Sequence, residues 1–216
     1  AADAGHFSVV GWTMSDPAGA KTLGHGLSGA PELIFVKNRT DAGTNWPVFS
    51  KVAGNTKYQY LSTTASAAAF NMWQNNSPDE DVFYVNSNNE ASGSANDEMI
   101  AYCFRSVPGV CKVGSYEGNG ASGDPNADGT YISMGFKPRW VMVKVIDSGV
   151  GSDGNWTIYD TARQPFNSTT SSPTFFADEV NPTGGPERSN SHNIDILSDG
   201  VKFRDNSNQT NSTRTY

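Results

Sequence analysis

The chain has 216 residues, of which 36% are hydrophobic, 11% aromatic and only 17% charged. Its formal net charge is −7, and Lys and Arg form no cluster, so the sequence lacks the basic stripe that nucleic-acid binding requires and disfavours docking on an anionic membrane surface. The apolar runs are far shorter than the ~20 residues that cross a bilayer, and the aromatic content is too high for a disordered chain, so a folded, acidic protein without membrane insertion is expected.

Short runs of β-branched and aromatic residues, separated by Gly, Asn-Gly and Asp-Gly turns, predict strands along almost the whole chain. In chain order these runs cover residues 7–12, 33–36, 45–49, 57–61, 82–85, 99–104, 111–116, 140–145, 155–159, 194–197 and 200–203. The alanines within residues 63–71 favour one or two turns of helix. Strand runs at this spacing are typical of an antiparallel β-sandwich of the jelly-roll or lectin type, so the predicted fold class is all-β with little helix.

The two halves of the chain resemble each other. Residues 30–37 (Ala-Pro-Glu-Leu-Ile-Phe-Val-Lys) match residues 137–144 (Lys-Pro-Arg-Trp-Val-Met-Val-Lys), and each match is followed by an Asn-Trp pair. Self-similarity of this kind predicts a tandem duplication, with repeat unit 1 at residues 1–108 and repeat unit 2 at residues 109–216. The two units could also contribute halves to one composite sandwich.

The end of the second unit differs from the end of the first. Alignment places Thr215 and Tyr216 at the start of the run equivalent to residues 99–104, so the final strand of unit 2 is expected to be missing and the chain to be a fragment or a mature piece. Proteins normally cover an open sheet edge. The N-terminal segment, the insertion at residues 164–190 or a strand from a neighbouring subunit is expected to fill this place.

Several segments resemble one recurrent β-module of marine bacteriophage virion proteins, of the tail-fibre and adhesin kind, often found beside laminin-G-like lectin modules. These segments include Val9-Val10-Gly11-Trp12-Thr13, Gly24-His25-Gly26-Leu27, Ile100-Ala101-Tyr102-Cys103-Phe104 and Gly114-Ser115-Tyr116-Glu117-Gly118. The resemblance implies an extracellular module on the virion surface that contacts a host polysaccharide or glycan without catalysis. It also implies other virion subunits as partners and a homo-oligomer in the parent assembly. It carries no catalytic residues over to this chain.

Aromatic and amide side chains provide candidate glycan contacts. The pairs Asn45-Trp46 and Asn155-Trp156 combine amide donors and acceptors with an indole face on which a pyranose ring can stack, and Tyr116 could widen such a platform. The alternative is that both tryptophans fill equivalent places in the two cores. Trp73 lies in a polar stretch without a counterpart in unit 2, so it is the candidate with the strongest expectation of exposure.

Residues Asp124, Asn126 and Asp128 place oxygen ligands at alternate positions before a Gly, as in the first half of a calcium loop, with the backbone carbonyl of Thr130 as a further ligand. The twelfth position is Gly135, so the bidentate acid of such a loop has no equivalent. A metal-free Asp-Gly turn is therefore favoured, and Ca²⁺ stays the alternative.

Catalytic signatures are weak. None of the three histidines has a partner at zinc-ligand spacing, and no nucleophile elbow, P-loop or dinucleotide motif occurs. A polysaccharide lyase or glycosidase is the main alternative function, and a structural shell or filament subunit is the second. The residues that could serve an enzyme are Tyr159, Asp160, Arg163, His192 and Asp195. Cys103 and Cys111 are too few for a disulfide scaffold, and buried free thiols are favoured over a bridge.

Overall fold

The computed structural model describes residues 5–121, 127–147, 154–163, 167, 172–178, 187–190 and 192–216. Among these residues every regular element is a β-strand, and all strand pairs are antiparallel. The predicted all-β, antiparallel class is therefore confirmed. No helix in this described part of the chain is long and apolar enough to cross a membrane. The chain forms two compact units: unit 1 comprises Ala1–Leu61 with Ala67–Gly114, and unit 2 comprises Ser62–Ser66 with Ser115–Tyr216.

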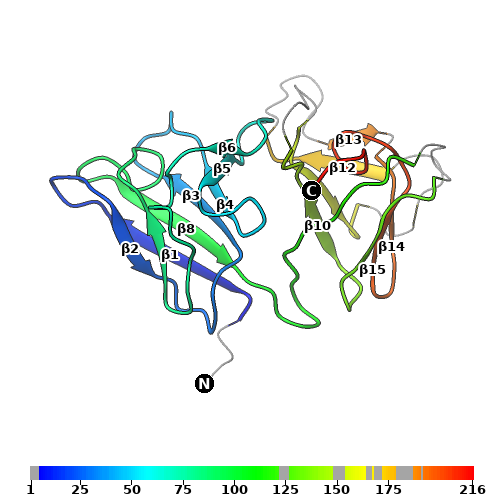
Figure 1. Ribbon diagram of the computed structural model, residues 1–216, viewed down its shortest axis with the longest axis horizontal. Coiled ribbons are helices and arrows are strands. Elements are labelled where there is room, and N and C mark those ends of the chain that lie inside the picture. Colours follow the sequence, from blue (N-terminus) through cyan, green and yellow to red (C-terminus); the bar gives the residue numbers. More distant parts are fainter. Residues whose placement is uncertain are drawn as a thin grey trace. The chain divides into compact units, whose positions relative to one another are not determined.

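Unit 1 contains a six-stranded sheet and a separate two-stranded sheet (Figure 1). The larger sheet has the order β1-β8-β3-β4-β5-β6, and the smaller one pairs β2 with β7. The bounds are β1 Phe7–Thr13, β2 Lys21–Gly24, β3 Leu33–Asn38, β4 Pro47–Ser50, β5 Lys57–Tyr60, β6 Ala68–Ala69, β7 Val82–Val85 and β8 Glu98–Phe104. Because β8 joins the sheet between β1 and β3, the last strand of the unit is central to it.

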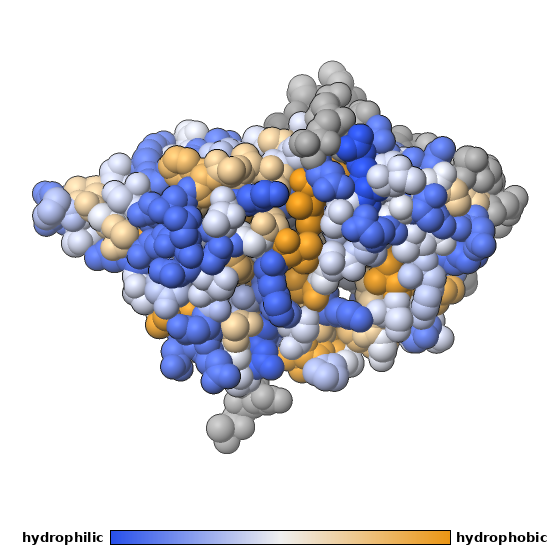
Figure 2. Space-filling model, viewed as in Figure 1, coloured by the Kyte–Doolittle hydropathy of each residue, from blue (hydrophilic) through white to orange (hydrophobic). Residues whose placement is uncertain are grey.

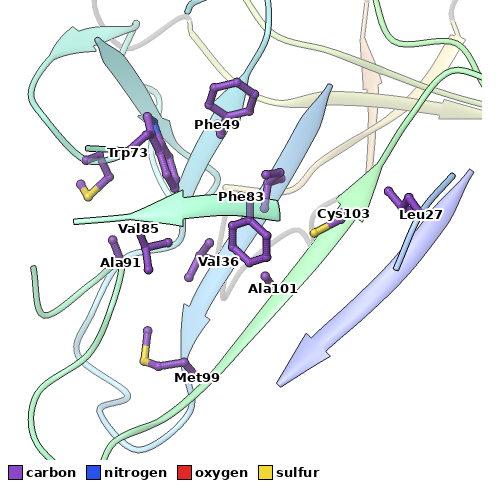
Figure 3. Packing of buried hydrophobic residues seen from close by; sticks show 12 residues of the cluster. Leu27, Val36, Phe49, Trp73, Phe83, Val85, Ala91, Met99, Ala101 and Cys103 are labelled. Carbon is purple, nitrogen blue, oxygen red and sulfur yellow. The ribbon is translucent and has the colours of Figure 1, made fainter. Parts of the chain in front are cut away.

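The core of unit 1 lies between these two sheets. Alternate residues of β8 face this core, namely Met99, Ala101 and Cys103, and each is at most 1% exposed. Phe83 and Val85 face it from β7 and are fully buried. Figure 3 shows these side chains gathered in one cluster. On β7 and β8 the period-2 alternation of buried residues therefore places one face of each strand in the core.

Unit 2 is built from shorter strands. A four-stranded sheet has the order β10-β11-β12-β13, and a three-stranded sheet has the order β14-β15-β9. The bounds are β9 Tyr131–Ser133, β10 Trp140–Val143, β11 Thr157–Asp160, β12 Ser172–Phe176, β13 Glu187–Asn190, β14 Ile194–Ile196 and β15 Gly200–Phe203. Valines of β10 pack with Tyr159, Phe203 and Tyr216 in the core of this unit.

Backbone hydrogen bonds at the ends of the two units correspond. The N–H of Arg39, just after β3, donates to the carbonyl of Glu98 at 2.8 Å, and the N–H of Ile146, just after β10, donates to the carbonyl of Thr215 at 3.0 Å. Tyr216 and Tyr116 exchange backbone hydrogen bonds at 3.0 and 3.2 Å. Thr215 and Tyr216 therefore form backbone hydrogen bonds next to the end of β10. The first residues of β8 form equivalent bonds next to the end of β3.

Two predicted elements are wrong. Residues 63–71 form no helix, because Ala68 and Ala69 pair with β5 as the short strand β6, and this tertiary pairing overrides the helix propensity of alanine. Residues 111–116 form no strand, since Cys111 closes a turn by bridging to Val107. Cys103 and Cys111 are both free, as predicted, but only Cys103 is buried, whereas Cys111 is partly exposed.

Candidate functional site

In unit 1, Lys37 and Trp46 form a pair on the face of the six-stranded sheet that points away from the core. On β3 the buried residues Ile34 and Val36 face the core, so Lys37 projects to the other side. Its Nζ lies 5.8 Å from the ring centroid of Trp46 and donates to the carbonyl oxygen of Thr44 at 2.6 Å. The ammonium group therefore fixes the loop before β4 and contacts the indole at the same time.

Asn45, next to Trp46, is held by a carboxylate. Both its backbone N–H and its Nδ2 donate to Oε1 of Glu90, at 3.2 and 2.9 Å, and the hydroxyl of Tyr60 donates to Oε2 of the same side chain. Burial, together with the bond to Glu90, raises the pKa of Tyr60. Lys37, Thr44, Asn45, Trp46, Tyr60 and Glu90 are called the Trp46 cluster below. This cluster keeps Asn45 and Trp46 in fixed orientations.

Aromatic side chains continue from the Trp46 cluster across the same face of the sheet. The rings of Trp46 and Tyr102 stack at 6.4 Å with an interplanar angle of 18°, and Tyr102 stacks in turn with Phe7. Phe7 and Val9 on β1 are 43% and 51% exposed, while Trp46 is half-buried. Figure 2 shows hydrophobic surface in separate patches among hydrophilic side chains on the visible face. This face of unit 1 therefore offers a row of aromatic rings that is partly open to solvent.

Unit 2 repeats the Lys–Trp pair in a buried form. Nζ of Lys144 lies 5.5 Å from the ring centroid of Trp156 and donates to the carbonyl oxygens of Thr63 (3.1 Å) and Gly154. Asn155 donates to Asp178 at 3.1 Å and accepts from Gln209. The exposed fractions are 4% for both Asn155 and Trp156 and 6% for Lys144. These side chains hold loops together inside unit 2. Because they are buried, they offer little surface for direct contact with a glycan.

The pKa of Lys144 makes the stability of unit 2 depend on pH. Burial lowers this pKa from the ordinary 10.5 to about 8, although the nearby Asp178 opposes the shift. Between these two values the unfolded chain binds more protons than the folded chain, so the free energy of unfolding rises with pH. We expect Lys144 to add about 2 kcal/mol between about pH 8 and about pH 9.5, measured by urea unfolding of unit 2.

The matched variants are Lys144→Met and Lys37→Met. Lys144→Met should abolish this rise in stability, whereas Lys37→Met should leave it intact. Keeping the titration below the ordinary pKa of tyrosine prevents Tyr116 and Tyr159, whose pKa values are raised by burial, from adding a slope of opposite sign. A rise that persists in Lys144→Met would assign the pH dependence to another group.

The expected exposure of Trp73 is wrong. Its side chain is 1% exposed, its ring packs edge-on against Phe49 at 5.8 Å, and its indole N–H donates to the carbonyl of Lys57 at 2.9 Å. Tyr116 is half-buried between two rings, Phe203 at 5.2 Å and Tyr216 at 4.9 Å. Trp73 lies in the core of unit 1 and is therefore not part of a platform with Trp46, and Tyr116 packs against the core of unit 2.

The candidate calcium ligands are described only in part. Asp124 and Asn126 lie outside the described residues. Asp128 forms an ion pair with Lys202, which lowers the pKa of its carboxyl group, and the carbonyl of Thr130 accepts the N–H of Phe203 at 3.1 Å. Among the described residues, no group of three His, Cys, Asp or Glu side chains could hold a metal ion. Calcium binding by this loop stays a prediction.

Each candidate catalytic acid is engaged by an arginine. Asp160 forms an ion pair with Arg163, and Asp195 one with Arg204 at 2.6 Å. Burial alone would raise the pKa of Asp160, but the N–H and the guanidinium group of Arg163 outweigh it and lower the pKa. Tyr159 is fully buried, and His192 packs against Phe176 at 6.1 Å. A glycosidase needs a carboxyl group that retains its proton, and the lowered pKa of Asp160 does not favour this role.

The charged residues that hold the Asn45-Trp46 and Asn155-Trp156 pairs in place were not identified from the sequence. Lys37 and Lys144 end the matching segments 30–37 and 137–144, so the repeat itself held a signal for them. Glu90 and Asp178 lie in segments of the two units that do not resemble each other in sequence. The folded chain brings each of them to its Asn-Trp pair.

No curated protein and no solved structure matches the chain in comparisons of sequence and of fold. A family model matches residues 1–216 and so spans both units. The chain therefore belongs to the family described as Domain of unknown function (DUF7483).

Proposed function

We propose that the chain is a non-enzymatic surface module of a phage virion that contacts host glycans through unit 1. The observation that carries this proposal is the Trp46 cluster. A half-buried indole lies beside an amide and an ammonium group, and the carboxylate of Glu90 fixes the amide. Protein sites for sugars combine a flat ring with oriented donors and acceptors, since a pyranose has an apolar face and polar edges.

We further propose that the two units are copies of one sandwich. The Lys–Trp pairs on β3 and β10 and the corresponding backbone bonds of Arg39 and Ile146 support this origin. The copies differ in burial at the Asn-Trp pair, and glycan contact belongs to the copy in which the indole reaches solvent.

Replacing Trp46 by Ala should weaken glycan binding by roughly tenfold or more, because a stacking aromatic side chain is a typical hot spot. A glycan array identifies the ligand, and calorimetry on its best hit measures the affinity. Trp140→Ala is the matched control, since Trp140 is an exposed tryptophan at 54% in unit 2 and lies outside the cluster. It should bind as the parent chain does.

Incubation with the same polysaccharides, followed by product analysis, tests the alternatives. Unsaturated or new reducing-end products would overturn the proposal in favour of a lyase or glycosidase. A complete lack of binding and cleavage would favour a structural subunit. The exposed apolar side chains of Phe7 and Val9 favour this second candidate, since a protein neighbour covers such residues more readily than a sugar does.

A further inference from the structure

Lys144 and Asn155 lie together in a buried part of unit 2. Lys144 follows β10, Asn155 comes shortly before β11, and their exposed fractions are 6% and 4%. Nζ of Lys144 donates to the carbonyl oxygen of Gly154, the residue before Asn155. It also lies 5.5 Å from the ring centroid of Trp156, the residue after Asn155. The amine therefore contacts both chain neighbours of Asn155, which leaves the amide carbon Cγ within reach of the flexible lysine side chain.

The amide of Asn155 is held between a carboxylate and a hydrogen-bond donor. Its Nδ2 donates to Oδ2 of Asp178 at 3.1 Å, and its Oδ1 accepts Nε2 of Gln209 at 2.9 Å. The hydroxyl of Thr157 donates to Oε1 of Gln209 at 3.3 Å, which fixes the orientation of that amide. The N–H of Trp156 donates to Oδ1 of Asp178 at 2.8 Å. The oxygen of the Asn155 amide therefore faces a donor, and its nitrogen faces an acceptor.

These groups are the parts that an exchange of one amide for another requires. Burial lowers the pKa of Lys144 to about 8, so the neutral amine, the form that attacks a carbonyl carbon, is populated near neutral pH. The N–H of Gln209 points at the oxygen that gains negative charge when a nucleophile adds to Cγ. Asp178 lies beside the nitrogen that would leave, and its charge also acts on Lys144. A nucleophile, an oxyanion donor and a proton carrier thus surround one amide carbon.

We propose that Lys144 and Asn155 join in an intramolecular amide bond, with loss of ammonia. Nζ leaves the carbonyl of Gly154 and attacks Cγ with its lone pair, so that the Cγ–Nζ bond forms and the Cγ–Nδ2 bond breaks. The carboxylate of Asp178 accepts one proton from Nζ and passes it to Nδ2, which departs as NH₃. One C–N bond replaces another, so the step consumes no oxidant, metal or cofactor. The product ties the end of β10 covalently to the segment that leads into β11.

Unit 1 holds the same residue types in a more exposed setting. Nζ of Lys37 donates to the carbonyl of Thr44, and the amide of Asn45 donates to Glu90. Lys37, Asn45 and Trp46 are only half-buried, so water stays in contact with the ammonium group. We therefore expect the bond in unit 2, with the loss of one ammonia.

Intact-mass measurement on the whole chain tests this proposal. After incubation above the pKa of Lys144, the chain should be lighter than its sequence by the mass of one ammonia. The loss should become faster as the pH rises and level off above about pH 8, since only the neutral amine attacks. Digestion by trypsin and then by a protease that cuts before aspartate locates the bond. Residues 140–146 and 153–159 should stay joined, and trypsin should not cut after Lys144.

Three variants separate the roles of the groups. Lys144→Arg retains a positive charge but cannot form the amide, so it should keep its full mass. Asp178→Asn should slow the loss by about a hundredfold or more, the usual contribution of general acid–base catalysis. Lys137→Arg is the matched control, because Lys137 is an exposed lysine of unit 2. It should lose ammonia as the parent chain does.

The titration of Lys144 described above belongs to the free amine. A chain of full mass should gain stability between about pH 8 and about pH 9.5, whereas a chain that has lost ammonia should not. A parent chain that keeps its full mass after days above the pKa of Lys144 would overturn the proposal. So would a lighter chain whose fragments 140–146 and 153–159 separate, because the ammonia would then have left another amide. A loss that persists in Lys144→Arg would overturn it as well.

Discussion

Replacing Trp73 by Ala should lower the free energy of unfolding of unit 1 by about 3–5 kcal/mol, the range expected for a large aromatic residue removed from a core. The side chain is 1% exposed and packs edge-on against Phe49. Its loss would also leave the carbonyl of Lys57 without the indole N–H that it accepts at 2.9 Å. The cavity and the lost hydrogen bond then add to each other.

Urea unfolding followed by circular dichroism measures this change. Phe70→Ala is the matched control, because Phe70 lies three residues away and is 50% exposed, and a surface substitution of this kind should cost less than about 0.5 kcal/mol. Trp73→Phe should fall between the two, since it fills much of the space but cannot donate to Lys57. A Trp73→Ala variant that unfolds at the parent concentration of urea and yet loses glycan binding would restore the expectation that Trp73 contacts a ligand.

The burial of Trp73 could not be predicted because its neighbours in sequence are polar. Asn71, Asn75 and Asn76 are exposed, whereas Met72 and Trp73 are buried. Positive φ angles at Gln74 and Asn75 turn the chain back after the tryptophan. Residues distant in sequence hold this turn, as the amide of Gln74 donates to the carbonyls of Lys21 and Val85 at 2.9 and 3.0 Å. Contacts between residues so far apart in sequence leave no pattern in the residues around Trp73.

Strands were predictable where alternation and β-branched residues agree. The runs at β7 and β15 have the predicted bounds, because each is a short apolar segment that ends at a turn. The run at residues 111–116 has comparable residues and forms no strand. The matching segment of unit 1, β1, is held by pairs with β8 along its whole length. Among the described residues of the later segment, Cys111 bonds back to Val107, and pairing with Tyr216 and Thr215 begins at Tyr116 and Glu117. Strand formation here depends on a partner and not on propensity alone.

The candidate site was predictable to a similar degree. The sequence identified Asn45 and Trp46, and the structure holds both in an ordered cluster. It identified Asn155 and Trp156 equally well, although they are buried. Matched motifs do not report which of the two Asn-Trp pairs reaches solvent, since burial depends on loops that differ between the units. Glu90 and Asp178 illustrate this, because each holds an Asn-Trp pair from a loop that is distant from the pair in sequence.

Gly200→Ala should lower the free energy of unfolding of unit 2 by about 2–3 kcal/mol, the upper part of the usual range for overpacking. Gly200 begins β15 and lies opposite Ser133 of β9. A Cβ at this position would overlap the backbone carbonyl oxygen of Ile132. Because the obstacle is backbone and not a flexible side chain, relief requires β9 and β15 to move apart, which would expose the buried Val201.

Gly114→Ala is the matched control, because a Cβ there meets nothing within 4 Å. It should leave stability unchanged or raise it slightly, since alanine reduces the freedom of the unfolded chain. Hydrogen exchange separates a local effect from a global one: the amides of β9 and β15 should lose protection in Gly200→Ala before those of β10 and β11 do. Equal stability and equal protection in both variants would show that β9 and β15 approach less closely than the carbonyl contact requires. The three-stranded sheet would then depend on its apolar side chains and not on the close backbone approach that only glycine permits.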